Sequence, residues 1–172
     1  MNLQSNDFEL FALAQKFSQD RAAIDSRWKE LQREAHPDNF AAQGSSAQRV
    51  AMQWSVRINE AYQRLKDPLK RAIYLCELNG AAVNSENNTA MPASFLLQQI
   101  EWREALDAAK QAKNIDEIAL QTNEYVRNML LKIEHLIDVE NNFKLAVEQV
   151  RALMFIERFA QEVDARLDQL QQ

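Results

Sequence analysis

The sequence predicts an all-α protein, a helical hairpin followed by a three-helix bundle. The 172 residues include only two glycines and three prolines, and 47% are hydrophobic. Residues that favour helix, such as Ala, Leu, Gln and Glu, are frequent. Apolar residues also recur at intervals of three and four along most of the chain. We therefore expect no strands, and one globular domain or two small ones.

The first helix of the hairpin is expected to begin after Asp20, a residue type that caps helices well. One buried stripe on this helix would comprise Ile24, Trp28, Leu31 and Ala35. Pro37 disfavours helical dihedral angles at His36, so the helix should end there. Asp38 and Asn39 are turn-forming residues. A polar loop is therefore predicted directly after this helix.

A second helix should follow the loop and pack against the first in an antiparallel hairpin. Its single apolar face would comprise Val50, Trp54, Ile58, Ala61, Tyr62 and Leu65. We expect a short helix around residues 8–13, before the hairpin, and another helix after Pro68 in "LKRAIYLCEL". Both would pack across the hairpin.

A domain boundary is predicted in the asparagine-rich stretch "NGAAVNSENNTAMP", which is poor in large apolar residues. We assign residues 1–79 to the first domain, 80–92 to a linker and 93–172 to the second domain. Helical patterns at roughly 93–112, 115–137 and 142–170 predict the three-helix bundle.

Composition also restricts the class of partner. The net charge of −5 disfavours binding to nucleic acid, so a protein partner is expected. Cys76 is the only cysteine, which excludes a disulfide framework and a cysteine-built zinc site, and it is better explained as a core residue than as a reactive thiol. No transmembrane segment or signal peptide is recognised, so we expect no membrane binding and a cytoplasmic location. No cofactor or metal is expected.

The tripeptide His36-Pro37-Asp38 is the first candidate site. It could simply stop a helix, with His36 favoured at the negative end of the helix dipole. A catalytic His/Asp pair lacks an accompanying nucleophile, metal-ligand cluster or oxyanion site, so we expect no catalytic residues and no enzyme activity. On the preceding helix, Lys29 and Arg33 lie one turn apart and nearly opposite the apolar stripe, with Arg27 at its flank. These three residues form a basic strip that leads to the loop, a candidate docking surface.

The bundle has a second candidate surface. In its first helix a core-facing stripe comprises Phe95, Trp102, Leu106 and Ala109, and in its last helix a core face comprises Ala146, Val150 and Leu153. Leu96, Leu97 and Ile100 lie off the first stripe, and Phe155 points away from the second core face. An exposed apolar patch is implied. It could be covered by the linker or by the hairpin domain, or it could bind another protein.

Taken together, these motifs resemble those of a known family. The basic helix, the tripeptide His36-Pro37-Asp38 and then "INEAYQRLKDPLKRAIYL" are similar, in this order, to the J domain of DnaJ-type co-chaperones. The "DFELFAL" start, the "HPDNF" loop, the lack of a Gly/Phe-rich or cysteine-repeat region, and "SFLLQQIEWREALDAA" after the linker resemble the HscB type. The resemblance spans nearly the whole chain.

This resemblance implies a co-chaperone that stimulates the ATPase of a DnaK-like chaperone, HscA, and brings it the iron-sulfur scaffold protein IscU. His36, Pro37 and Asp38, with Arg27, Lys29 and Arg33, would contact the chaperone. The scaffold would dock on Leu96, Leu97, Ile100 and Phe155, with Glu101 and Glu104 orienting it. We expect a monomer. The sequence departs from most J domains at Ala35, where an aromatic residue is usual, and at Asn39, where Lys or Arg is usual. It also lacks the amino-terminal cysteine cluster of some eukaryotic relatives.

Two alternatives stay open from the sequence. The bundle could serve a J-domain co-chaperone with a different client. It could instead be a histidine phosphotransfer domain that presents His135 in "LLKIEHLIDVEN". Such a histidine needs a nearby lysine and a small residue that admits phosphate, whereas Val139 and Glu140 follow here.

Overall fold

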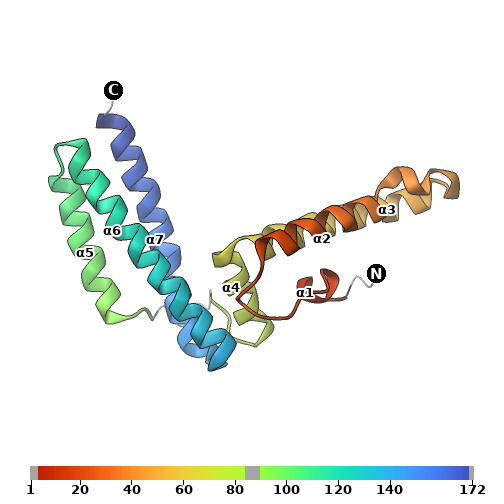
Figure 1. The fold of residues 1–172 in the computed structure, drawn as a ribbon, viewed down its shortest axis with the longest axis horizontal. Helices are drawn as coiled ribbons and strands as arrows, with labels where there is room; N and C mark the ends of the chain where they lie inside the picture. The colour runs from red at the N-terminus through yellow and green to blue at the C-terminus, as the bar shows by residue number, and fades with distance from the viewer. Residues whose placement is uncertain (1–3, 84–89, 171–172) are drawn as a thin grey trace. The chain divides into compact units, whose positions relative to one another are not determined.

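The computed structural model describes residues 4–83 and 90–170, and all regular elements in these two ranges are helical. The chain divides into two compact units, Met1–Leu75 and Cys76–Gln172. Figure 1 shows the elements of both units. In chain order they are α1 (Asp7–Leu10), α2 (Arg21–Glu34), the 3-10 helix η1 (Pro37–Gln43), α3 (Ser45–Lys66), α4 (Pro68–Leu78), α5 (Ala93–Ala108), α6 (Ala112–Glu134), the π-helical turn η2 (His135–Val139) and α7 (Phe143–Leu170).

The first unit is built around the α2–α3 hairpin, as predicted. The Asp20 side chain accepts a hydrogen bond from the Ala22 N–H at 2.9 Å and caps α2. Helix α2 ends at Glu34, just before the predicted stop at His36. Across the hairpin, the Trp28 ring stacks on Tyr62 with 4.7 Å between the ring centroids. These contacts fix the side-by-side packing of α2 and α3 that leads to the loop.

The apolar face of α3 differs from the prediction at its amino-terminal end. Ile58, Ala61 and Leu65 are buried as expected, but Val50 is exposed and Ala51 is buried instead. Val50 lies in the part of α3 that faces η1 and the end of α2, where the opposing residue is the small Ala35. The prediction that Val50 is buried was therefore wrong. Periodicity identifies the apolar face of a helix, but it does not show how large the side chains on the opposing helix are.

A buried carboxylate ties α1 to α3 and α4. Asp7 is fully buried, and it forms ion pairs with Arg57, at 2.6 Å, and with Arg64. Its backbone N–H donates to the Tyr74 hydroxyl at 3.0 Å. Because a buried charge is costly unless it is paired, this cluster fixes the short helix in one position. Asn6 and Glu9 close a capping box around the same helix.

The second unit is a three-helix bundle of α5, α6 and α7 (Figure 1). The predicted core stripes are buried throughout: Phe95, Trp102, Leu106, Ala109, Ala146, Val150 and Leu153. The Trp102 ring stacks on Phe159 of α7 and meets Tyr125 of α6 edge-on. These aromatic contacts place all three helices around one core.

Two boundaries differ from the predicted ones. Helix α5 ends at Ala108 and not near residue 112, because Ala109 adopts an extended conformation while its side chain is buried. After Glu134 the chain continues in a π-helical turn, which no local pattern indicated. The division between the compact units falls inside α4, a few residues before the predicted linker 80–92, and residues 84–89 of that linker lie outside the described ranges. The domain limits 1–79 and 93–172 stay predictions.

Candidate functional site

The loop after α2 presents two of its three signature side chains to water. The side chains of His36 and Asp38 are 59% and 88% exposed. His36 caps η1, and its Nδ1 accepts a hydrogen bond from the Asp38 N–H at 3.3 Å, while Asp38 Oδ2 lies 3.5 Å from the same nitrogen. This hydrogen bond ties the His36 ring to the backbone of Asp38.

Asn39 has a structural role in this loop. Its side-chain amide donates to the Arg33 carbonyl in the last turn of α2 at 2.8 Å. The Asn39 N–H also donates to the His36 carbonyl at 3.0 Å. At its other end η1 stops at Gly44, whose φ of 91° favours glycine. The loop is thereby fixed at both ends.

Two of the three residues in the predicted basic strip are exposed. Lys29 and Arg33 are exposed, as expected from the helical wheel. Arg27 is half-buried, and its guanidinium lies 3.1 Å from Glu30 and 3.8 Å from Glu34. These two carboxylates offset the charge of Arg27. Lys29 and Arg33 therefore carry the exposed positive charge of the strip.

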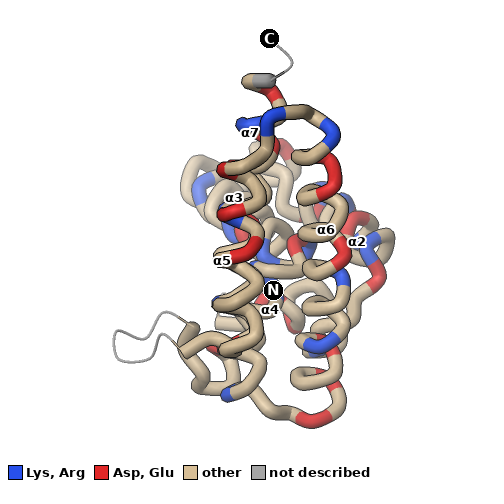
Figure 2. Tube along the Cα trace, turned by 90° about the vertical axis from the view of Figure 1, so that its left-hand side faces the viewer, with Lys and Arg blue, Asp and Glu red and all other residues tan. Residues whose placement is uncertain are grey.

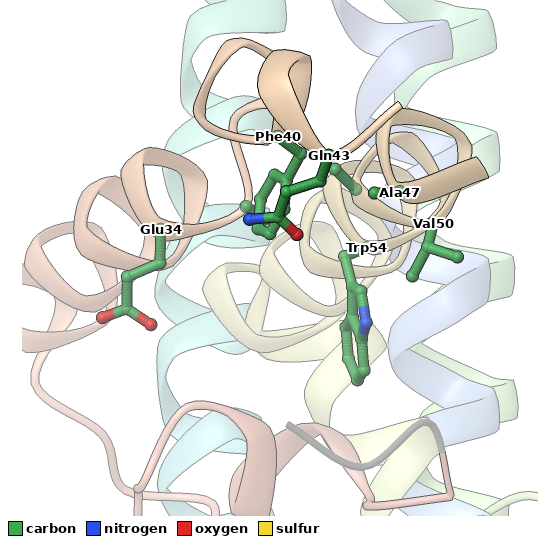
Figure 3. Close-up of a pocket in the computed structure, with 8 residues that line it drawn as sticks. Glu34, Phe40, Gln43, Ala47, Val50 and Trp54 are labelled. Atoms are coloured by element: carbon green, nitrogen blue, oxygen red, sulfur yellow. The ribbon is translucent and has the colours of Figure 1, made fainter. Parts of the chain in front are cut away.

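A pocket of about 330 Å³ lies next to the loop, between the end of α2, η1 and the first turns of α3. Figure 3 shows Phe40 and Gln43 of η1, Val50 and Trp54 of α3, and Glu34 of α2 around it. Ala35 also lines it, at the position where the J-domain resemblance predicts an aromatic side chain. The sequence identified the substitution but not the pocket, because a cavity depends on the directions of side chains from three elements.

The predicted apolar patch of the bundle is exposed. The exposed fractions are 43% for Leu96, 66% for Leu97, 56% for Ile100 and 39% for Phe155. We call these four residues the client patch, after the scaffold-docking role that the family resemblance predicts for them. Glu101 and Glu104 are exposed on the same helix as the three aliphatic members, and Glu101 accepts a hydrogen bond from the Gln98 amide at 3.1 Å.

Phe155 lies level with the other members of the client patch. In an up-down-up bundle, α5 and α7 run parallel, and the stacking of Trp102 on Phe159 fixes their register. One turn earlier on each helix are Gln98 and Phe155. Phe155 is therefore at the height of the turn that carries Leu96, Leu97 and Ile100. Arg158 covers one side of its ring, with its guanidinium carbon 6.0 Å from the ring centroid.

Other candidate groups offer no comparable site. Burial raises the pKa of the Cys76 thiol to about 11, so it stays protonated and unreactive at neutral pH. His135 is exposed, but its Nε2 lies 3.1 Å from Glu140 Oε1. A carboxylate at this position is unfavourable for a phosphate on His135, as the sequence already indicated. Residues 4–83 and 90–170 contain no group of three His, Cys, Asp or Glu side chains placed to hold a metal ion.

Charged residues occur along the described parts of both units. In Figure 2 acidic positions, in red, and basic positions, in blue, are scattered over both parts of the chain. Among the described helices, none combines the length and the apolar content that crossing a membrane requires.

The fold and the exposed loop define a J-domain protein with a carboxy-terminal helical bundle. Residues 91–164 match the family model described as "HSCB C-terminal oligomerisation domain". The chain is 44% identical to a co-chaperone HscB homologue of Burkholderia multivorans and 46% identical to one of Paraburkholderia xenovorans, and the alignments cover 99% of this chain and at least 98% of each relative. The chain belongs to the HscB family of J-domain co-chaperones, which function in iron-sulfur cluster assembly.

Solved structures agree with this assignment. The chaperone HscB from Vibrio cholerae superimposes with a TM-score of 0.82 at 34% identity, and the alignment covers 96% of this chain and 99% of that one. Human co-chaperone HscB shares the fold with a TM-score of 0.88 at 22% identity, over 96% of this chain and 84% of that one. The all-α prediction and the HscB-type resemblance are thus confirmed, and a phosphotransfer domain is not supported.

Proposed function

We propose that this chain stimulates the ATPase of an HscA-type chaperone and delivers an IscU-type scaffold protein to it, without catalytic chemistry of its own. The observation that carries the proposal is the pairing of two exposed surfaces on separate compact units. One is the braced His36-Pro37-Asp38 loop, and the other is the client patch. We place this activity in the cytoplasm.

The loop would act by selecting a state of the chaperone. A ligand shifts a conformational equilibrium only when it binds one state better than the other. Asn39 and the His36–Asp38 contacts fix the loop before it binds, so little conformational entropy would be lost on docking. Lys29 and Arg33 would favour the encounter with an acidic surface and mainly raise its rate.

Single-turnover ATP hydrolysis by the chaperone tests the first half of the proposal. His36→Gln and Asp38→Ala should each abolish stimulation and leave the helical circular dichroism unchanged, because both side chains are exposed. Lys113→Met, an exposed lysine at the start of α6, serves as a control that should stimulate normally. Full stimulation by both loop variants would remove the proposed role of the loop.

The client patch would hold the scaffold. A few central apolar anchors usually carry most of the energy of an interface, and Leu97 and Ile100 are more than half exposed. Carrying both sites on one chain raises the local concentration of the scaffold near the chaperone. A monomer is sufficient for both proposed roles. The family model matched by residues 91–164 is nevertheless described as an oligomerisation domain, so an oligomer is the alternative state. Sedimentation at micromolar concentration distinguishes these two states.

A further inference from the structure

Arg151 is a buried charged residue of the second unit, outside both of the proposed binding surfaces. It lies on α7 and is only 7% exposed. Its Nε donates a hydrogen bond to the Val83 carbonyl at 2.8 Å, and its Nη1 donates to the Ala90 carbonyl at 3.3 Å. A guanidinium buried at this depth is costly unless its N–H groups are hydrogen-bonded, so these two bonds belong to the fold of this unit.

The two carbonyls that accept these bonds differ in their surroundings. Val83 is 2% exposed, so the packing of its side chain fixes the first carbonyl in place. Ala90 lies two residues before Pro92, after which α5 begins, so the second carbonyl is where the chain enters that helix. Arginine can hold both because its N–H groups form a rigid planar fork. Arg151 thereby ties the start of α5 to α7.

The start of α5 depends on ties to its neighbours. No side chain in the described part of the chain caps this helix, so its first turn is not fixed by a local cap. Towards α6 the helix is held by Phe95, which is fully buried and contacts the Tyr125 ring with 6.1 Å between the ring centroids. Towards α7 the stacking of Trp102 on Phe159 holds it two turns further on. Arg151 adds a tie to α7 ahead of the first turn.

The client patch lies between these ties. Its three aliphatic members are on α5, after Ala90 and before Trp102, and its fourth member, Phe155, lies one turn after Arg151 on α7. Because the patch is built from two helices, the spacing of its members depends on how α5 is held against α7. An interface loses affinity when its contact groups have to be ordered on binding, so a patch that is already fixed binds more tightly.

We propose that Arg151 is a positioning residue for the client patch. By holding the start of α5 against α7, it fixes Leu96 and Leu97 relative to Phe155 before a client protein binds. The side chain is buried within the bundle, so it acts through the arrangement of the patch and not through contact with the client. This inference rests on the proposed function, because it requires that a scaffold protein docks on the patch.

Two measurements on the full chain test the role of Arg151. Arg151→Met, which removes the donors but keeps an aliphatic side chain, should weaken calorimetric binding of an IscU-type scaffold at least fivefold. In the free variant, hydrogen exchange should become faster at the Leu96 and Leu97 amides and stay unchanged in the middle of α6. Arg151→Lys, which keeps a charged donor without the fork, should recover part of the affinity. Val163→Ala is the control for lost stability, because Val163 is buried further along α7, and it should keep the wild-type affinity.

Unchanged scaffold affinity in Arg151→Met would overturn the proposal, and so would an equal loss of affinity in Val163→Ala. Faster exchange throughout the bundle of Arg151→Met would also overturn it, since the loss of affinity would then reflect general unfolding. If Arg151→Met fails to fold, as judged by circular dichroism, the same two measurements on Arg151→Lys decide. A wild-type chain that binds no scaffold would contradict the proposed function as well, whereas normal wild-type binding with an unaffected variant would contradict the role of Arg151 alone.

Discussion

Replacing Leu96, Ile100 and Phe155 together with alanine separates a binding surface from a structural core. If the three side chains belong to the client patch, the variant should stay folded and lose affinity for an IscU-type scaffold. Stimulation of the chaperone by the loop alone should persist, because the loop lies in the other compact unit. The extra stimulation obtained with scaffold present should disappear.

The expected change in stability follows from the exposed fractions. Full burial of Leu, Ile or Phe is worth roughly 1.5–3 kcal/mol, and these three side chains are 43%, 56% and 39% exposed. Each truncation thus removes about 1 kcal/mol of burial. Alanine returns up to about 0.5 kcal/mol at Ile100 and Phe155 through its higher helix propensity. The triple variant should lose about 2 kcal/mol of unfolding free energy, whereas three core residues would cost on the order of 10 kcal/mol.

Urea denaturation followed by circular dichroism measures this difference, and calorimetric titration with scaffold measures the affinity. Leu120→Ala is a matched control, because Leu120 is an exposed leucine on α6 outside the client patch. It should change neither quantity appreciably. Phe95→Ala is the opposite control, since Phe95 is fully buried and its truncation should cost about 3–5 kcal/mol. Unchanged scaffold affinity in a folded triple variant would refute the assignment of the patch.

Four further outcomes are expected. Asp7→Asn should lower the unfolding free energy by about 3 kcal/mol in urea denaturation, because it removes a buried partner of two arginines; a loss below 1 kcal/mol would show that the arginines are satisfied by water. Ala35→Phe should raise it by about 1 kcal/mol by filling the adjacent pocket, and a loss would mean that the pocket cannot accept a ring. Cys76 should resist iodoacetamide at pH 8 until urea unfolds the chain, since its pKa is raised to about 11. The double variant Lys29→Glu, Arg33→Glu should slow chaperone association and reduce the salt dependence of the association rate. An association rate that changes neither with charge reversal nor with salt would show that the strip has no docking role.

Local chemistry explains why much of the fold could be predicted. The cap at Asp20 and the stop before Pro37 depend on one residue and its immediate neighbours. The buried stripe of α5 follows from helical periodicity, and the off-stripe residues Leu97 and Ile100 were predicted to be exposed for the same reason. In each case the decisive interaction lies within one or two helical turns, so it is visible in the sequence.

The features that were missed depend on which helices meet. Periodicity assigned Val50 to a buried face, but the small Ala35 opposite it leaves a pocket. Asp7 is a polar residue at the start of a short helix, and only the fold brings two arginines of α3 to it. Gln149 reads as an ordinary surface residue of α7, yet it is buried beside the first turn of α5. Long-range contacts of this kind have no local signature.

Asn39, where most J domains have Lys or Arg, and the paired Arg27 would together weaken the charge available for docking. Asn39 replaces a cation with a neutral amide that braces the end of α2, and Arg27 is already paired with two glutamates. In the proposed complex with a chaperone, the electrostatic attraction of the loop region would therefore depend on Lys29 and Arg33. With fewer charges, the orientation of the partner would depend more on the shape of the fixed loop and of the adjoining apolar pocket. Restoring a cation with Asn39→Lys would add charge but remove the brace, so we expect faster encounter together with faster dissociation, and stopped-flow kinetics can resolve the two effects.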